Sequence, residues 1–233
     1  MSGALKRVAW EHWVGLAGLV LLGIGSYVGL VEAPPERYMG EVGRILYIHV
    51  PTAWIALLTL TVAAVAAGMW LWKRRPGWDD VQVGCVEVGI ILVAMLLVQG
   101  STWARPTWGV FWTWDPRLTT AAILLLAFIA VLALRAFVDD AYRRATWTAV
   151  ATLVAAVDVP IVYYSVKWWR TLHQDFSSPE TVAGSMTLPL RINAFALLFL
   201  ATWLVARRAR LARLKRGTRV LEPPKRSALV AGE

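Results

Sequence analysis

Residues Thr107–Thr120 read TWGVFWTWDPRLTT and stand between two long apolar segments. The aromatic residues of this stretch are Trp108, Phe111, Trp112 and Trp114, and Asp115 and Arg117 follow them. Tryptophan surface is costly to leave in water, and an ordinary membrane loop has no need of so much of it. The stretch therefore predicts a platform at a membrane boundary for a flat, apolar ligand.

The composition indicates an integral membrane protein. Of 233 residues, 58% are hydrophobic and only 17% are charged, which is more apolar than the core of a soluble domain of this size can hide. The single cysteine, Cys85, excludes an internal disulfide. The sequence holds no CxxC motif for redox exchange and no CxxCH motif for covalent haem attachment.

Six apolar segments are long enough to cross a bilayer core of about 30 Å as helices. They lie near residues 14–31, 50–72, 81–100, 118–138, 145–166 and 187–206. Lys6 and Arg7 precede the first segment, as in a signal peptide, but its apolar run is long and no small-x-small cleavage site follows, so we expect it to be retained. The predicted fold is an all-α polytopic membrane protein with a tryptophan-rich outer loop between spans 3 and 4.

The distribution of basic residues predicts the orientation of these spans. One side holds 17 of the 24 Lys and Arg residues, and the other side holds 7. Cytoplasmic loops carry the excess of positive charge, so both termini are predicted to be cytoplasmic. The tryptophan-rich loop, His49 and His173 then lie outside, and the third histidine, His12, lies inside.

The chain divides into two predicted parts. Residues 1–206 form the membrane domain, with its tryptophan-rich segment at 101–120, and residues 207–233 form a basic cytoplasmic tail. We expect this tail to be partly disordered. A basic tail on a polytopic membrane protein faces anionic lipid and does not indicate nucleic acid as a partner.

His49 and His173 are predicted to lie at a similar depth. His49 precedes Pro51, and proline is favoured in the first turn of a helix, so His49 belongs at the outer end of span 2. His173 follows Trp168 and Trp169, which fit a membrane-interface belt or a ligand pocket equally well. A lone interfacial histidine is more often a surface residue than a ligand. Two histidines that bracket an aromatic segment favour axial ligation of haem iron.

Charged residues near these histidines have separate predicted roles. Arg117, Arg105 and Arg191 lie at or near the outer boundary, where they are candidate partners for haem propionates. Asp115 is predicted to cap span 4, because a carboxylate is favourable at a helix N-terminus.

Two acids, Glu87 and Asp158, lie within predicted spans. An ionised group there costs about 2.5–3.5 kcal/mol, so each should face the bundle interior, pair or stay protonated. We expect Asp158 to reach Arg191 of the next span, and we find no equally good partner for Glu87. Pro160 is expected to kink span 5.

The motif WGVFWTWDPRLT resembles the signature W-G-x-x-W-x-W-D-x-R-L-T of the tryptophan-rich haem-handling membrane proteins. The segments RILYIHVPTAW and VKWWRTLHQ, the six spans and the length resemble one family of that group, the haem exporter C family of cytochrome c maturation. Two departures are visible. Phe111 stands where the family often has another Trp, and Pro116 stands where a small residue is common.

The resemblance implies a haem-binding and transfer protein of the bacterial inner membrane, with its haem site on the periplasmic side. It implies that haem b is bound without a covalent link by His49 and His173. The side chains around it would be Trp108, Trp112, Trp114 and Arg117. It further implies presentation of haem to the chaperone CcmE and association with the ABC transporter CcmAB and the small membrane protein CcmD.

Two other function classes stay open. A haem lyase or attachment enzyme of the same superfamily is disfavoured, because those members are generally larger and carry more histidines than the three found in this sequence. A transmembrane electron carrier would need histidine pairs within the spans, usually at two depths. We therefore expect no turnover chemistry.

Overall fold

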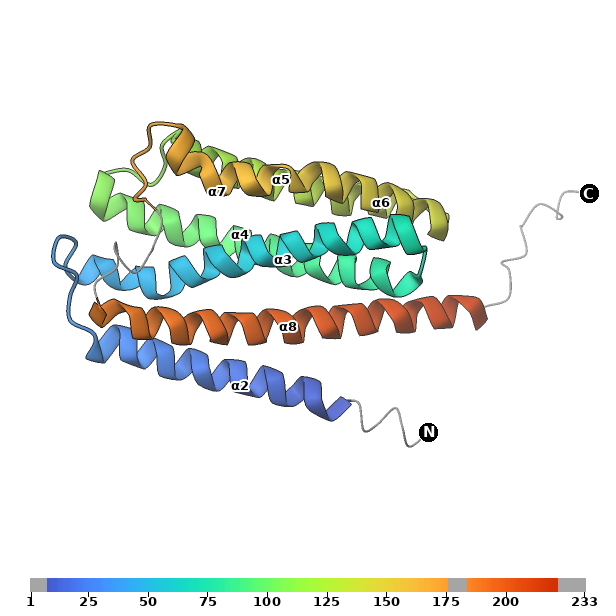
Figure 1. Ribbon diagram of the computed structural model, residues 1–233, viewed down its shortest axis with the longest axis horizontal. Coiled ribbons are helices and arrows are strands. Elements are labelled where there is room, and N and C mark those ends of the chain that lie inside the picture. The colour runs from blue at the N-terminus through green and yellow to red at the C-terminus, as the bar shows by residue number, and fades with distance from the viewer. Residues whose placement is uncertain (1–7, 176–183, 222–233) are drawn as a thin grey trace, which may run out of the picture.

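The computed structural model describes the backbone of residues 8–175 and 184–221, and the side chains of residues 10–175 and 184–216. These residues form helices and connecting loops, with no strand in the part of the chain described. Figure 1 shows that the helices run roughly along one axis as an elongated bundle. The predicted all-α fold is confirmed.

Six segments of the described chain are long and apolar enough to cross a membrane, which confirms the six predicted spans. The helices are α2 (Val8–Tyr27), α3 (Leu46–Lys73), α4 (Pro76–Trp108), α5 (Pro116–Phe137), α6 (Ala141–Ala156), α7 (Asp158–Trp168) and α8 (Gly184–Leu221). A π-helical turn, Val28–Glu32, extends α2, and a 3-10 turn, Glu41–Ile45, leads into α3. Helices α6 and α7 together make the fifth span.

The hairpin of α3 and α4 forms the centre of the bundle. On one side it packs against α8, which in turn carries α2, and on the other side it packs against α5 and α6 (Figure 1). Helix α7 continues this second side and lies mainly against α5. The bundle is therefore layered, from α2 through α8 and the central α3–α4 hairpin to α5, α6 and α7.

Small residues allow α3 and α4 to approach closely. Ala56 and Ala63 of α3 are fully buried, and Gly89 of α4 faces Leu60 of α3. A Cβ at Gly89 would lie 2.3 Å from Cδ2 of Leu60, so a larger residue does not fit there without a shift. Membrane helices associate through such contacts, because lipid tails are as apolar as the helix surfaces and close packing has to supply the attraction.

The fifth span is interrupted near its middle. Helix α6 ends at Ala156, and α7 begins at Asp158, two residues before Pro160. Proline has no N–H to donate, and its ring clashes with the carbonyl four residues earlier, which here belongs to Ala156. The helix is thus interrupted next to Pro160, where we expected span 5 to kink.

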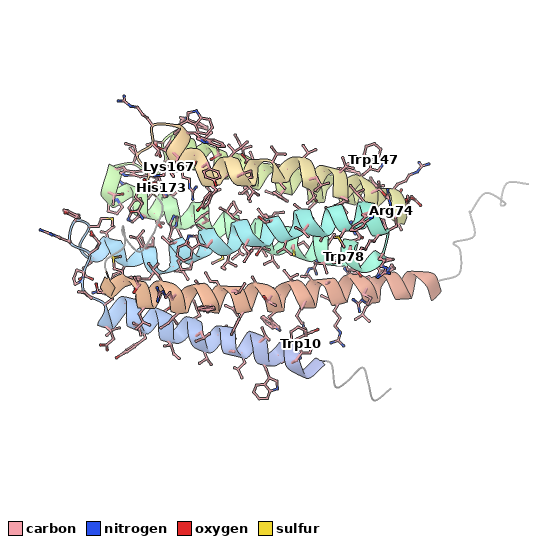
Figure 2. The ribbon with its side chains drawn as sticks, viewed as in Figure 1. Trp10, Arg74, Trp78, Trp147, Lys167 and His173 are labelled. Carbon is pink, nitrogen blue, oxygen red and sulfur yellow. The ribbon has the colours of Figure 1, made fainter. Side chains whose placement is uncertain are left out.

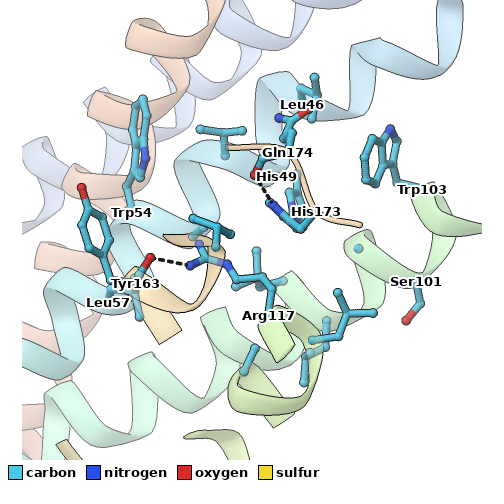
Figure 3. A pocket seen from close by; sticks show the side chains of 18 of the residues that line it. Leu46, His49, Trp54, Leu57, Ser101, Trp103, Arg117, Tyr163, His173 and Gln174 are labelled. Atoms are coloured by element: carbon cyan, nitrogen blue, oxygen red, sulfur yellow. Dashed lines mark hydrogen bonds between the residues drawn. The ribbon is translucent and has the colours of Figure 1, made fainter. Parts of the chain in front are cut away.

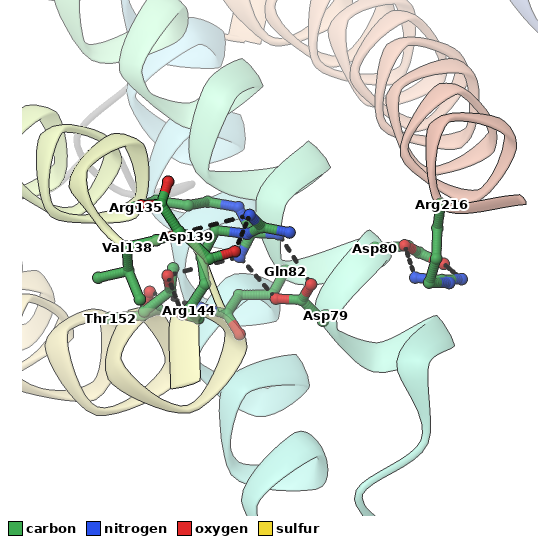
Figure 4. A network of polar contacts seen from close by, with 10 residues as sticks. Asp79, Asp80, Gln82, Arg135, Val138, Asp139, Arg144, Thr152 and Arg216 are labelled. Carbon is green, nitrogen blue, oxygen red and sulfur yellow. Dashed lines mark hydrogen bonds and ion pairs between the residues drawn. The ribbon is translucent and has the colours of Figure 1, made fainter. Parts of the chain in front are cut away.

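Two aspartates in the first turns of α4 are held by arginines from other helices. Asp79 accepts two hydrogen bonds from Arg135 of α5, at 2.7 and 2.8 Å. Asp80 accepts two from Arg216 of α8, at 2.6 and 2.7 Å (Figure 4). Both aspartates are buried, so these two-point pairs supply the compensation that a buried carboxylate requires.

Glu87 has a partner that the sequence did not reveal. Arg208 of α8 binds both of its carboxylate oxygens. We expected the chain after residue 206 to be a partly disordered tail. Instead, α8 continues to Leu221, and Arg208 and Arg216 bind carboxylates on α4. The charge of these arginines attaches this part of the chain to the bundle. Residues 222–233 lie outside the part of the chain that the structure describes.

Asp158 and Arg191 are not brought together. Helix α7 packs mainly against α5, whereas Arg191 is exposed on α8, which packs against α2, α3 and α4. Within the described residues, Oδ2 of Asp158 is buried without a hydrogen-bond partner. The expected pair does not form, because spans 5 and 6 are consecutive in sequence but lie in different layers of the bundle.

Candidate functional site

The predicted site residues gather at one end of the bundle. Figure 2 shows His173 and Lys167 at this end and Arg74 at the opposite end. We call the first the histidine end and the second the basic end. The start of α3, the end of α4, the start of α5 and the segment after α7 all reach the histidine end. Segments far apart in sequence are therefore close enough to form one site.

The irregular part of the tryptophan-rich stretch is shorter than expected. Helix α4 continues to Trp108, and the loop covers only residues 109–115. Gly109 ends the helix with a φ of 80°, a left-handed conformation that favours glycine, and its N–H donates to the carbonyl of Arg105. The sharp turn after Trp108 directs the following aromatic residues back across the end of the bundle.

A cavity of about 120 Å³ lies at the histidine end, as Figure 3 shows. Both His49 and His173 line it, although 124 positions separate them in the sequence. Most of its remaining wall is apolar or aromatic. The described lining residues that matter for binding are His49, Trp54, Gly100, Trp103, Trp108, Trp112, Arg117, Tyr163, His173 and Gln174.

His173 is oriented by its neighbour in the chain. Its Nδ1 lies 2.8 Å from the carbonyl oxygen of Gln174. A carbonyl can only accept, so Nδ1 carries the proton, and Nε2 of the neutral ring keeps its lone pair. Burial lowers the pKa of His173, and the Gln174 carbonyl acts in the opposite direction. The neutral imidazole, which is the form that binds metals, is thereby favoured.

His49 lies in the first turns of α3, at the predicted end of span 2. Its Nδ1 is buried and has no hydrogen-bond partner among the described residues. The ring packs against Gly100 of α4, where a Cβ would lie 3.3 Å from Cε1 of His49. A buried polar atom without a partner is costly.

Asp115 links the tryptophan-rich loop to the segment that carries His173. Its carboxylate accepts from the backbone N–H of Arg117, at 2.9 Å, which confirms its predicted role as the cap of span 4. It also accepts from the hydroxyl of Thr171, at 2.7 and 2.8 Å, and from the N–H of Leu172, at 2.7 Å. The Thr171 hydroxyl oxygen in turn accepts from the N–H of His173, at 3.0 Å. One carboxylate therefore holds α5 and the His173 segment together.

Arg117 lines the cavity but is already engaged. Its guanidinium donates to the carbonyl of Val162 and, at 3.2 Å, to the carbonyl of Tyr163 on α7 (Figure 3). The side chain thus joins the start of α5 to the middle of α7. A guanidinium has five N–H donors, so these contacts leave donors for an anionic group of a ligand.

The three predicted tryptophans differ in position. Trp108 and Trp112 line the cavity. Trp114 is outside its lining, is 83% exposed, and packs edge-to-face on Trp112 with ring centroids 5.9 Å apart. Phe111 is also exposed, at 59%. The motif therefore has one aromatic group in the cavity wall and another on the open surface.

Trp103 and Trp54 line the cavity, although the sequence did not single them out as site residues. Trp103 is buried, and its ring meets that of Trp108 edge-to-face at 5.4 Å. Trp103 lies five residues before Trp108 on α4, a spacing that does not place the two side chains on one face of a helix, so the local sequence does not mark it. Trp54 lies five residues after His49 on α3, and nothing in its local sequence marks it.

Other candidate residues lie away from the cavity. Arg105 sits over the ring of Phe111, with 5.7 Å from Cζ to the ring centroid, and Arg191 is exposed on α8. Trp168 and Trp169 are both exposed, and Trp168 stacks on Tyr164 at 5.5 Å. Their position outside the cavity lining favours the membrane-interface interpretation of these two tryptophans.

Known proteins share most of this chain. Residues 4–222 match the family described as Heme exporter protein C. The heme exporter protein C of Bradyrhizobium diazoefficiens is 38% identical over 208 residues, which cover 86% of this chain and 78% of that protein. The heme exporter protein C of Escherichia coli K12 is 34% identical over 200 residues, covering 85% and 81%. A putative cytochrome c biosynthesis ccmC-like mitochondrial protein of Arabidopsis thaliana is 32% identical over 196 residues, covering 83% and 74%.

Proposed function

Because the chain belongs to the heme exporter protein C family, which supports a role in haem handling for cytochrome c maturation, we propose that it binds haem b between His49 and His173. The observation that carries this proposal is that both imidazoles line one cavity. His173 has its Nδ1 proton engaged by a carbonyl, and Nδ1 of His49 is buried without a partner.

The two histidines of the cavity suit a metal ion that is already bound in a macrocycle. The described residues include no group of three or more His, Cys, Asp or Glu side chains that could hold a bare metal ion. Two imidazoles can supply the axial positions of iron, and a porphyrin supplies the other four. The lining tryptophans, Trp103, Trp108 and Trp112, offer ring faces and edges to a flat macrocycle.

The cavity volume of about 120 Å³ is smaller than the roughly 300–1,000 Å³ typical of small-molecule sites. We therefore propose that the tryptophan-rich loop and the His173 segment move apart to admit a porphyrin. Arg117 is the cationic group in the wall, and we assign it to a propionate. This arrangement holds and releases haem, and we assign the chain no turnover chemistry of its own.

The exposed aromatic side chains indicate where haem is handed on. Trp114 and Phe111 lie on the open surface directly beside the cavity-lining Trp112. We propose that this surface meets the haem chaperone CcmE on the periplasmic side of the inner membrane. We further propose that the chain assembles with the ABC transporter CcmAB and the small membrane protein CcmD.

Purification in mild detergent tests the proposal. We expect about one haem per chain with a six-coordinate, low-spin absorption spectrum, as two axial histidines require. Acid–acetone should extract this haem completely, because the sequence has no CxxCH motif for covalent attachment. A correctly folded preparation that contains no haem and takes up none when haem is added would overturn the proposal.

Replacing Asp115 with Ala is expected to lower haem content, because the segment that carries His173 is then held less firmly. The substitution removes the acceptor for Thr171 and Leu172. Hydrogen bonds to a charged group are worth about 1.5–3 kcal/mol each, so haem affinity should fall on the order of tenfold or more. Added imidazole should restore the low-spin spectrum, and hydrogen exchange should become faster in residues 169–175.

Asp140→Ala is the matched control for this change. Asp140 also caps a helix, α6, and accepts from the N–H of Arg143 at 2.7 Å. It lies outside the cavity lining, so its loss should cost about 1 kcal/mol of stability and leave haem content unchanged. Equal haem loss in both variants would show that Asp115 acts only as a cap.

A further inference from the structure

A second cavity, of about 590 Å³, lies at the basic end of the bundle. It is bounded by the turn between α3 and α4, the start of α6 and the C-terminal part of α8. Its volume falls within the roughly 300–1,000 Å³ typical of small-molecule sites. Arg74, on its wall, lies at the opposite end of the molecule from His173 (Figure 2). The proposed haem site therefore makes no use of this cavity.

The cavity wall has a surplus of positive charge. Its basic residues are Arg74, Arg135, Arg144, Arg208, Lys215 and Arg216. Its acidic residues are Asp79, Asp80 and Glu87. Six cations thus face three carboxylates, and each carboxylate is bound at two points by one arginine. Figure 4 shows these contacts for Asp79 and Asp80. The residues that line the cavity therefore carry a net charge of +3, which makes the cavity attractive to an anion.

The cationic side chains come from four separate parts of the fold: the end of α3, and helices α5, α6 and α8. Arg74 ends α3 in a left-handed conformation, with a φ of 52°, and its guanidinium lies 5.5 Å from the ring centroid of Tyr142. The ring of Tyr142 lies 5.9 Å from that of the buried Trp70. Lys215 approaches the same cavity from α8. Aromatic rings and cations therefore share one wall, as at a membrane–water boundary.

We propose that this cavity binds the phosphate of an anionic phospholipid headgroup. Arginine guanidinium groups match phosphate oxygens in geometry and charge. Basic pockets between membrane helices are known to take anionic lipid headgroups. The cavity lies at one end of six membrane-length segments, the level at which headgroups stand. Soluble phosphate has the same chemistry, so the test has to separate the two sources.

The test compares three ligands on the detergent-solubilised full chain. Short-chain phosphatidylglycerol should raise the unfolding temperature, and phosphatidylcholine of the same chain length should not. Native mass spectrometry should detect retained phosphatidylglycerol after mild delipidation. Inorganic phosphate at the same concentration should have no effect if the site requires a lipid. A shift with phosphate equal to that with phosphatidylglycerol would assign the site to soluble phosphate instead.

Two double substitutions test whether phosphatidylglycerol binds in this cavity. Arg74→Gln with Lys215→Gln removes two cations of the wall, and the affinity for phosphatidylglycerol should fall on the order of tenfold or more. Arg75→Gln with Arg213→Gln is the control. It also removes one cation from the turn between α3 and α4 and one from α8, but neither residue lines the cavity. This control should bind lipid as the unchanged chain does. Equal loss in both variants, or no loss in either, would overturn the proposal.

Discussion

Replacing either His49 or His173 with Ala is expected to remove most of the haem from the purified protein. Each variant loses one proposed axial ligand, and even the loss of a group that only supports a metal ligand commonly costs roughly 10–100-fold in affinity. Any haem that remains should change from a low-spin to a high-spin spectrum. Added imidazole should partly restore the low-spin form, because it occupies the position that the missing side chain leaves.

His12→Ala is the control for this result. His12 is exposed on α2, near the start of that helix, and it does not line the haem cavity. Its replacement should leave both haem content and spectrum unchanged. Equal haem loss in all three histidine variants would mean that the substitutions disturb folding, and it would undo the assignment of the ligands.

Replacing Trp108 and Trp112 together with Ala is expected to weaken haem binding, whereas Trp114→Ala should mainly impair transfer. The first two side chains line the cavity, and the third is exposed beside it. An aromatic pair is worth about 0.5–1.5 kcal/mol, so replacement of Trp108 or Trp112 with Phe, which keeps a ring face, should leave much of the haem bound. The measurement is haem content beside the haem transferred to co-expressed CcmE.

Trp147→Ala is the control for these tryptophan variants. Trp147 is exposed at the basic end of the bundle, where Figure 2 labels it, so Trp147→Ala removes an equally large surface ring far from the site. It should change neither measurement. Normal transfer by a folded variant with Ala at Trp108, Trp112 and Trp114 would show that these tryptophans only anchor the loop in the membrane.

The elements of the fold follow from signals carried by short stretches of sequence. Apolar runs of about 20 residues are long enough to cross a bilayer wherever they occur, and all six predicted spans are present. Pro160 interrupts its span because the missing N–H and the ring act on residues within one turn. Asp115 caps α5 for an equally local reason, because its carboxylate accepts from the backbone N–H of Arg117, two residues later.

The composition of the candidate site is only partly visible in the sequence. His49, His173, Trp108, Trp112 and Arg117 were predicted from their types and positions, and the structure brings these five into one cavity wall. The exposed position of Trp114 could not be read from the motif. Whether an aromatic side chain of this short loop faces the cavity or the outer surface depends on the direction in which the chain leaves α4 at Gly109. It also depends on the helices packed beneath the loop.

Sequence alone determined the class of the protein, its six spans and the residue types from which a site could be built, because hydrophobicity, helix breaking and capping act over a few neighbouring residues. Tertiary structure decided which side chains distant in sequence bind one another. Glu87 is bound by Arg208, 121 positions away, and Asp115 by Thr171, 56 positions away. Such pairs depend on which helices share a layer of the bundle, and packing between helices, rather than the residues beside each partner in the sequence, sets that arrangement.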